Sequence, residues 1–352
     1  MVIKIHLLSL QLMERRILSG IIFIAALSVF YSCKQKQQEE KKPVARAFST
    51  IEPEVDRLSK EIKANPKNAD ALFRRAKVYV DQKKFKLAFA DINQAVALDS
   101  LKTDYLLLQA DVLFANMMIP QAVETFQKSI ALNPKNTEAY LKLAELQLYI
   151  KKYKESIQYA NEALKINKHI GKAYFIKGFV FKETGDTIKA ISSFQTCVEQ
   201  EPDNYDAYMQ LGILYGAKKN KLAAQYYANA LRLNPKSIEA LYDRGLFYQD
   251  NQEFNKAIED YTAILKIDPN NKDAHYNLGY IHLVYLKVYE QAIKHFTDAI
   301  RCDPYFVQAY YNRGLCYENL GNIAAAAEDY KQAIKIYPTY KLAFDGLKRI
   351  AS

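Results

Sequence analysis

The chain has 352 residues, half of them apolar, and only 11 glycines and 10 prolines. Average soluble proteins use these turn-forming residues roughly twice as often, so the shortage argues against a many-stranded β-sandwich or a glycine-rich nucleotide-binding enzyme. The apolar fraction argues against a disordered chain. Half of the net charge of +10 lies in the first 50 residues, and the rest is spread along the sequence. It forms no concentrated basic stripe of the kind that binds nucleic acid.

Residues 1–32 have the features of a secretory signal peptide. Arg15 and Arg16 precede an apolar stretch of 15 residues, Ile17 to Tyr31, which is shorter than the roughly 20 residues of a membrane span. Met13 is an alternative start. The stretch is followed by a small residue, Ser32, and then by Cys33.

This arrangement resembles the lipobox of bacterial lipoproteins. The resemblance implies that the signal is removed before Cys33 and that the Cys33 thiol is lipidated. An uncleaved signal anchor and a soluble secreted protein are the alternatives. Residues 33–53 are rich in Lys, Gln and Glu and are predicted to form a polar tether. Such a tether would span about 25 Å as a random coil and on the order of 65 Å fully extended.

The prolines that follow reveal an internal repeat. Seven of the ten lie on a lattice of about 34 residues: Pro66, Pro134, Pro202, Pro235, Pro269, Pro304 and Pro338. Five glycines share the period: Gly178, Gly212, Gly245, Gly279 and Gly314. Ala76, Ala110 and Ala144 occupy the same phase in earlier repeats. The period and the small residues resemble the tetratricopeptide repeat (TPR), a helix-turn-helix unit.

The resemblance implies an all-α fold, a right-handed TPR α-solenoid of eight helix-turn-helix repeats with capping helices. The predicted repeats span 69–102, 103–136, 137–170, 171–204, 205–237, 238–271, 272–306 and 307–340. An N-terminal capping helix is expected in 54–68 and a C-terminal one in 341–352. One repeat has 33 residues and one has 35. We expect these length changes to fall in the turns between helices.

Small and large side chains alternate in a way that predicts helix packing. Position 8 of each repeat, in its first helix, is Gly or Ala, and position 24, in its second helix, is usually Phe or Tyr. The small residue lets the facing aromatic ring approach closely, as in ridge-into-groove packing. Ile264 stands at a position where most repeats have Ala, and the pattern does not explain it.

No motif for catalysis, phosphate binding or metal binding is present, so the sequence predicts neither an enzyme nor a cofactor. His275 and His282 fall on the packing face of one helix, and their expected role is packing. The expected role of Cys197, Cys302 and Cys316 is that of small buried apolar residues. Two acidic residues, Asp260 and Asp329, are predicted to make polar contacts between helices.

The TPR resemblance implies that the first helix of each repeat lines a concave groove through positions 2, 5, 6, 9, 12 and 13. In the early repeats these positions carry mixed charge: Asp70, Arg74, Lys77, Asp81, Asp104, Asp111, Lys142 and Glu145. Later they become apolar and aromatic, with two amides: Phe175, Phe179, Met209, Ile213, Tyr242, Leu246, Tyr276, Asn277, Tyr280, Tyr311, Asn312 and Leu315. These twelve residues are the candidate ligand-binding residues, although packing against neighbouring helices is the competing interpretation. No repeat has the Lys and Asn pair of the family's carboxylate clamp.

The resulting hypothesis is a membrane-tethered adaptor in the bacterial cell envelope, lipid-anchored and placed at the outer membrane. Its groove would bind a protein or peptide partner, either an extended segment or an amphipathic helix. The alternatives are a glycan-binding or glycan-processing envelope protein, whose aromatic residues would stack on sugars, and an RNA-binding helical repeat. The export signal and the lack of a basic stripe oppose the RNA-binding alternative.

Overall fold

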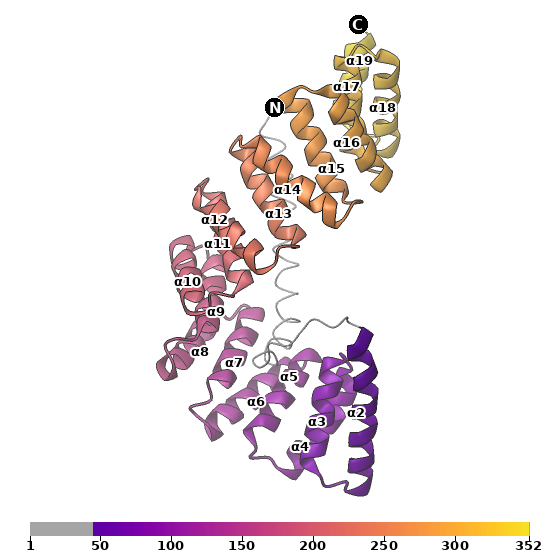
Figure 1. Cartoon of the computed structure of the whole chain (residues 1–352). Helices are drawn as coiled ribbons and strands as arrows, with labels where there is room; N and C mark the ends of the chain where they lie inside the picture. The colour runs from indigo at the N-terminus through magenta and orange to yellow at the C-terminus, as the bar shows by residue number, and fades with distance from the viewer. Residues whose placement is uncertain (1–44, 352) are drawn as a thin grey trace. The chain divides into compact units, whose positions relative to one another are not determined.

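The computed structural model describes residues 45–351, and every regular element in that range is a helix. The predicted signal peptide and Cys33 lie outside the described residues, as does most of the tether. The chain divides into two compact units, with the boundary between Glu201 and Pro202. Each unit is a stack of helical hairpins (Figure 1). In each hairpin we name the first helix the A-helix and the second the B-helix.

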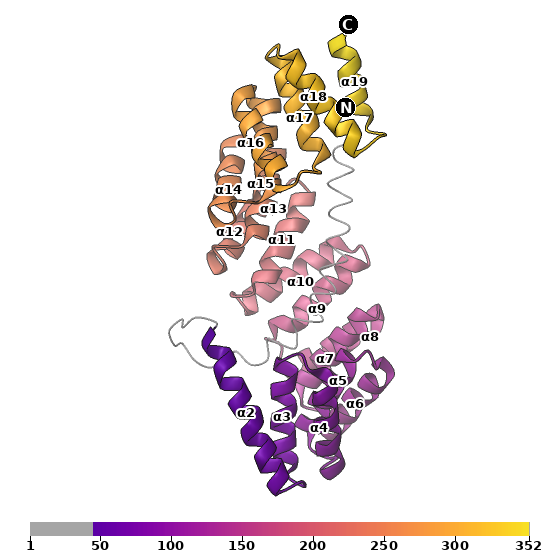
Figure 2. The same ribbon diagram turned by 90° about the vertical axis from the view of Figure 1, so that its right-hand side faces the viewer.

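The first unit begins with helix α2 (Ala45–Ala64), and four hairpins follow it (Figure 2). Helix α2 therefore starts inside the segment predicted as tether. The hairpins are α3 (Ala69–Asp81) with α4 (Phe85–Leu98), α5 (Thr103–Ala115) with α6 (Ile119–Leu132), α7 (Thr137–Tyr149) with α8 (Tyr153–Ile166), and α9 (Gly171–Glu183) with α10 (Thr187–Gln200).

The second unit also holds four hairpins and ends with helix α19 (Lys341–Ala351). Its third hairpin differs from the others because its A-helix runs on into a π-helix, η1. The hairpins are α11 (Tyr205–Ala217) with α12 (Leu222–Leu233), α13 (Ile238–Asp250) with α14 (Phe254–Ile267), α15 (Lys272–Tyr280) and η1 (Ile281–Leu286) with α16 (Tyr289–Cys302), and α17 (Val307–Asn319) with α18 (Ile323–Ile336).

Short polar residues and prolines set the helix ends. Several A-helices begin after a side chain that accepts a hydrogen bond from the first turn, as Asn68 does from the Ala71 backbone N–H at 3.0 Å. Each lattice proline lies two residues beyond the end of a helix, as Pro269 follows α14. The turn inside each hairpin contains one residue with positive φ: Lys83, Met117, Lys151, Gly185, Lys219, Gln252, Lys287 and Gly321.

The predicted contact between small and large residues is confirmed inside the hairpins. A Cβ atom placed on Gly245 would lie 2.9 Å from a ring carbon of Tyr261, which is fully buried. The equivalent glycines meet the aromatic ring of their own B-helix in the same way, with gaps of 2.5 to 2.8 Å: Gly178, Gly212, Gly279 and Gly314. Glycine at this position therefore lets an aromatic ring fill the centre of each of these hairpins.

A second contact inside the hairpins joins Arg at position 7 to Asp at position 23. Arg244 donates to both carboxylate oxygens of Asp260, at 2.9 and 2.6 Å. The predicted interhelix role of Asp260 and Asp329 is thereby confirmed, and Arg313 is the partner of Asp329. Asp260 and Asp329 are buried, so the arginine fork satisfies carboxylates that would otherwise be unpaired in the core.

The length change in the 35-residue repeat does not fall where we expected. The residues around it form η1, so the π-helical turn at the end of the A-helix takes up the extra residue. Lys287, which follows η1, is left-handed with φ of 55°. A π-turn places one more residue in the helical turn without changing the residues that pack below it.

The expected burial of the cysteines is confirmed for Cys197 and Cys316, whereas Cys302 is only partly buried. Ile264 is fully buried, and its larger side chain still has no explanation in the repeat pattern. Within residues 45–351, no helix has the length and apolar character needed to cross a membrane.

Candidate functional site

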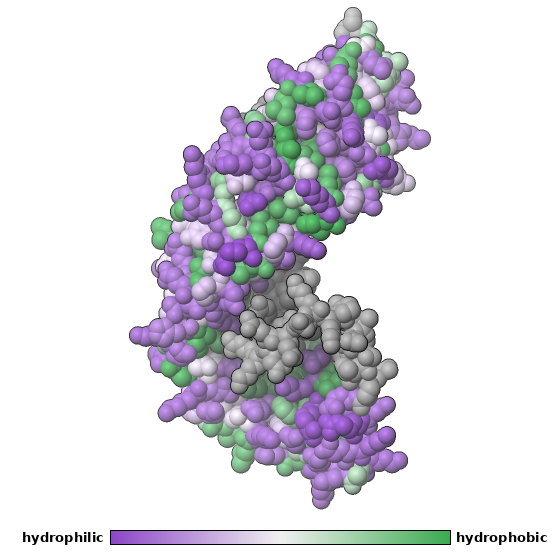
Figure 3. Space-filling view, in the orientation of Figure 1, coloured by the Kyte–Doolittle hydropathy of each residue, from purple (hydrophilic) through white to green (hydrophobic). Residues whose placement is uncertain are grey.

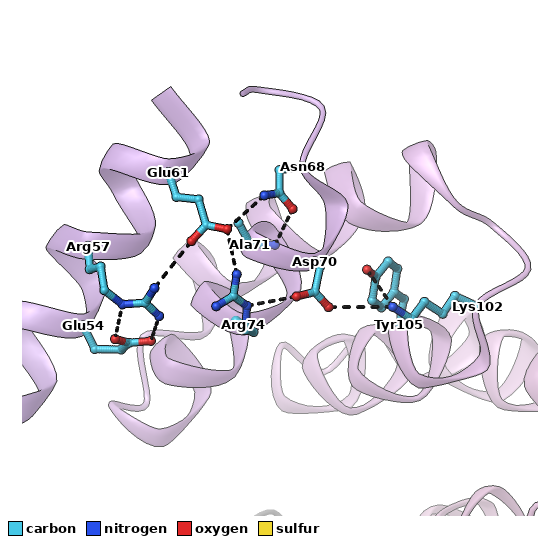
Figure 4. Close-up of polar contacts among 9 residues, drawn as sticks. All are labelled: Glu54, Arg57, Glu61, Asn68, Asp70, Ala71, Arg74, Lys102 and Tyr105. Atoms are coloured by element: carbon cyan, nitrogen blue, oxygen red, sulfur yellow. Dashed lines mark hydrogen bonds and ion pairs between the residues drawn. The ribbon is translucent and has the colours of Figure 1, made fainter. Parts of the chain in front are cut away.

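Charged side chains link successive A-helices of the first unit. The series begins at α2, where the carboxylate of Glu61 accepts from Arg74 of α3 at 2.8 Å. Asp70, also on α3, forms the next ion pair, with Lys102 just before α5, at 3.7 Å (Figure 4). It continues with Asp111 to Lys142 at 2.7 Å and Glu145 to Lys172 at 3.1 Å. The sequence identified most of these charges but not that they pair with one another.

The pair between Lys142 and Asp111 is the most enclosed member of this series. The side chain of Lys142 is 10% exposed and that of Asp111 is 16% exposed. Burial disfavours the charged form of Lys142, but the carboxylates of Asp111, Glu138 and Glu145 together outweigh that effect and raise the pKa of Lys142. Because Lys142 and Asp111 already satisfy each other, they offer little free charge to a ligand.

The twelve predicted site residues are divided between the two units. Phe175 and Phe179 lie on α9 in the first unit, where their rings contact each other edge to face at 4.9 Å and also contact Phe194. The other ten lie on α11, α13, α15 and α17 of the second unit, and we name them the tyrosine face: Met209, Ile213, Tyr242, Leu246, Tyr276, Asn277, Tyr280, Tyr311, Asn312 and Leu315. Figure 3 shows apolar side chains gathered over the region of α13 to α17.

Most of these side chains pack and remain partly accessible at the same time. Met209, Asn277, Tyr311 and Asn312 are buried, while Tyr242, Tyr276, Tyr280 and the three aliphatic members Ile213, Leu246 and Leu315 are half-buried. The tyrosine face is therefore a packed wall whose outer side still contacts solvent.

Aromatic contacts hold the tyrosine face in place. The ring of Tyr276 lies 4.9 Å from that of Phe306 and 5.7 Å from that of Phe296. Tyr311 lies 5.7 Å from Tyr330. Burial raises the pKa of Tyr276, so its hydroxyl stays protonated at neutral pH. These contacts make the rings rigid, which lowers the entropy lost when a ligand covers them.

The two amides differ although they occupy the same position in successive repeats. Asn312 donates Nδ2 to the hydroxyl oxygen of Tyr276 at 2.9 Å. Asn277 is buried, and its Nδ2 has no hydrogen-bond partner. A buried donor without an acceptor costs roughly 1–3 kcal/mol, so the Asn277 amide is the polar group on the tyrosine face with most to gain from a ligand.

Within the described part of the chain, no group of three or more His, Cys, Asp or Glu side chains has the arrangement of a metal site. Of the histidines singled out in the sequence, His275 is buried and His282 is half-buried, and both pack in the third hairpin of the second unit.

Comparison with known families agrees with this architecture. Models of the tetratricopeptide repeat match residues 55–102, 125–158, 171–204, 238–271 and 307–340, which together make up just over half of the chain. This chain belongs to the tetratricopeptide repeat family. The predicted TPR solenoid is confirmed, and a TPR scaffold fits a role in protein interaction.

Among known proteins, the chain is 33% identical over 110 residues to a UDP-N-acetylglucosamine–peptide N-acetylglucosaminyltransferase of Giardia intestinalis, covering 31% of this chain and 7% of that protein. It is 23% identical to the human tetratricopeptide repeat protein 16, covering 80% of this chain and 36% of that protein. The chain thus spans only a minor part of these relatives.

Among solved structures, the chain resembles the C-terminal part of a TPR repeat-containing protein from Cytophaga hutchinsonii. The TM-score is 0.60 at 22% identity, covering 68% of this chain and 98% of that one. The similarity supports the repeat fold.

Proposed function

We propose that this protein is an adaptor that binds an extended segment of a partner protein on the tyrosine face of its second unit. The observation that carries the proposal is the Nδ2 atom of Asn277, a buried donor with no acceptor. A backbone carbonyl of an extended segment would supply the missing acceptor. The free energy lost by leaving this donor unpaired in the free protein would then be recovered on binding.

The surroundings of Asn277 fit such a ligand. Tyr242, Tyr276 and Tyr280 are half-buried and offer ring area next to hydroxyl groups. Tyrosine provides large contact area at small entropic cost, which is why it is frequent at binding surfaces. Apolar side chains of the segment would cover the rings while its backbone bonds to the amide.

The first unit has a different role in this proposal from that of the second unit. Its A-helices carry charged side chains that are already paired with one another, such as Asp111 with Lys142. We propose that these ion pairs fix the geometry between successive hairpins and leave partner binding to the second unit. This assignment also weakens the alternative of a glycan-processing protein, since Asp70, Asp111 and Glu145 are already engaged by cations.

The proposal includes the membrane anchor predicted from the sequence. A lipid on Cys33 would hold the protein at the bacterial outer membrane, and the following polar residues would let the repeats reach a partner at a distance. Incorporation of labelled fatty acid should be abolished by Cys33→Ser. Labelling that persists in Cys33→Ser would exclude this anchor while leaving the binding proposal untouched.

Binding at the tyrosine face can be separated from packing by comparing the two amides. Asn277→Leu removes an amide whose nitrogen has no partner, whereas Asn312→Leu breaks the bond to Tyr276. We expect Asn277→Leu to weaken partner capture about three- to tenfold and to cost less folding stability than Asn312→Leu.

Capture is measured with a photo-crosslinking amino acid placed at Leu246, followed by identification of the crosslinked protein. The same amino acid at Tyr305 is the control, since Tyr305 is 78% exposed and lies outside the tyrosine face. Equal capture from both positions, or full capture by Asn277→Leu, would show that the tyrosine face only packs.

A further inference from the structure

Three histidines gather in the third hairpin of the second unit. His275 lies on α15, His282 on η1 and His295 on α16. The ring centroids of His282 and His295 are 5.4 Å apart, and those of His275 and His295 are 6.2 Å apart. We name these three residues the histidine cluster.

The hydrogen bonds of the cluster define where protons already sit. Nε2 of His275 lies 3.0 Å from the carbonyl oxygen of Pro269, and Nδ1 of His282 lies 2.8 Å from that of Leu278. A carbonyl only accepts, so each of these two nitrogens carries a hydrogen. Nδ1 of His275 and Nδ1 of His295 are buried without a hydrogen-bond partner.

Little negative charge is available to balance added protons. Asp298 on α16 is 4.0 Å from Nδ1 of His275, but it also pairs with Arg301 at 3.0 Å. The positive charge of Lys294, also on α16, lowers the pKa of His295 and so disfavours its protonation. Among the neighbouring elements, Asp268, before α15, accepts from the backbone N–H of Asn270 and the side chain of Asn271, Asp273 lies in the first turn of α15, and on α17 Arg313 is paired with Asp329.

Burial, together with the imidazoles of His282 and His275, lowers the pKa of His295 to about 4. Once exposed to water, an imidazole titrates near its ordinary value of about 6.5. A lowered folded-state pKa on a base means that the closed hairpin binds fewer protons than the opened one. The stabilisation of the closed form is therefore complete above about pH 6.5 and is lost progressively as the pH falls toward 4.

The element beside the cluster is the π-helix η1, in which Ile281 and Leu283 are buried. His282 belongs to η1, and its ring donates to the carbonyl of Leu278, one turn back in the helix. π-helical turns are rare and less favourable than α-helical ones, and they depend on side-chain contacts. At the end of η1 and just after it, Val284, Tyr285, Leu286 and Val288 are each 40 to 42% exposed. The ring of Tyr285 stacks on that of Phe254 of α14 at 4.2 Å, so loss of the contact between His282 and His295 would loosen this tip on the side of α16 while the contact to α14 remains.

We infer that the histidine cluster makes η1 a proton-sensitive element, which separates from α16 when the surroundings become acidic. The inference concerns the folded chain alone and holds whether or not the tyrosine face binds a partner. Because η1 continues directly from α15, opening would also loosen the end of the helix that carries Tyr276 and Asn277.

Hydrogen exchange followed by mass spectrometry tests this inference on the full chain, with EDTA present so that only protons bind. The measured quantity is the protection factor of residues 281–296, corrected for the intrinsic pH dependence of exchange. Between pH 7.5 and 5.0 we expect it to fall roughly ten- to thirtyfold, relative to helices of the first unit. His295→Phe keeps the ring volume and removes the titrating group, so the fall should disappear.

His169→Phe is the matched control, because it removes an exposed histidine of the first unit. It should leave the fall unchanged. If His295→Phe fails to fold, nitrogen-detected NMR of the unmodified protein replaces that test. It measures the protonation state of each histidine ring as the pH is lowered. A fall that persists in His295→Phe, a pH-independent protection factor, or a charged His295 ring at pH 6 would each overturn the inference.

Discussion

Asn312 donates its side-chain amide to the hydroxyl oxygen of Tyr276 at 2.9 Å and so joins α17 to α15. The sequence predicts both residues as ligand contacts, but in the structure they form a hydrogen bond with each other. The equivalent amide of the preceding repeat, Asn277, has no such acceptor for its nitrogen. Two residues at one repeat position can therefore have different contacts, even though the preceding A-helix has a tyrosine at the same position in both cases, Tyr242 before Asn277 and Tyr276 before Asn312.

This contact gives a direct stability test. Tyr276→Phe removes the hydroxyl and leaves the buried Asn312 amide without its acceptor. We expect a loss of about 1 kcal/mol in the free energy of unfolding, measured by urea denaturation. Tyr305→Phe, at an exposed tyrosine, should have no measurable effect. Equal effects of the two changes would contradict the role of the contact between Asn312 and Tyr276.

The glycine at position 8 can be tested against another helical glycine. Gly245→Ala places a Cβ 2.9 Å from the ring of Tyr261, whereas at Gly216, on α11, the nearest atom would be 3.7 Å away. Overpacking at Gly245 should cost about 1–3 kcal/mol of unfolding free energy. Gly216→Ala should instead stabilise the protein by about 0.5–1 kcal/mol, because alanine favours the helix. Thermal unfolding of both variants measures the difference.

The bidentate pair of Arg313 and Asp329 predicts a strong asymmetry between single and double changes. Arg313→Met leaves the buried Asp329 carboxylate unpaired and should cost about 3–5 kcal/mol. Replacing both residues with apolar ones, as Arg313→Met with Asp329→Leu, should recover most of that loss. Chemical denaturation of the two single variants and the double variant closes the cycle. A double variant as unstable as Arg313→Met would show that the ion pair itself is required.

The docking of α19 should depend on acidity. Glu318 on α17 accepts from Arg349 on α19 and from the hydroxyl of Tyr330, and the bond from Arg349 holds the pKa of Glu318 below its usual range. A lowered carboxyl pKa contributes stability above the ordinary value of about 4.5, and that stability is lost as the pH falls below it. Hydrogen exchange of residues 341–351 should therefore accelerate between pH 5 and 3, once corrected for intrinsic rates. In Glu318→Gln the additional acceleration should be absent.

The sequence alone determined the architecture of this protein. Proline spacing located the ends of the B-helices, and glycine spacing located where aromatic rings such as Tyr261 enter the hairpins. These features are readable because a helix end, a turn or a small-to-large contact depends on residues close together in the chain, and eight copies repeat the same solution. The acidic residues Asp260 and Asp329 were also placed correctly between helices for this reason.

Only the tertiary structure decided which of the candidate binding side chains are already engaged. Lys142 pairs with Asp111 of the preceding repeat, and Asn312 pairs with Tyr276, so both contacts bridge more than thirty positions of sequence. Likewise, the period showed an extra residue in the seventh repeat but not that η1 would take it up. The periodic pattern fixes the backbone of each hairpin, whereas the partner of a polar side chain depends on what the adjacent hairpin brings within 3 Å of it.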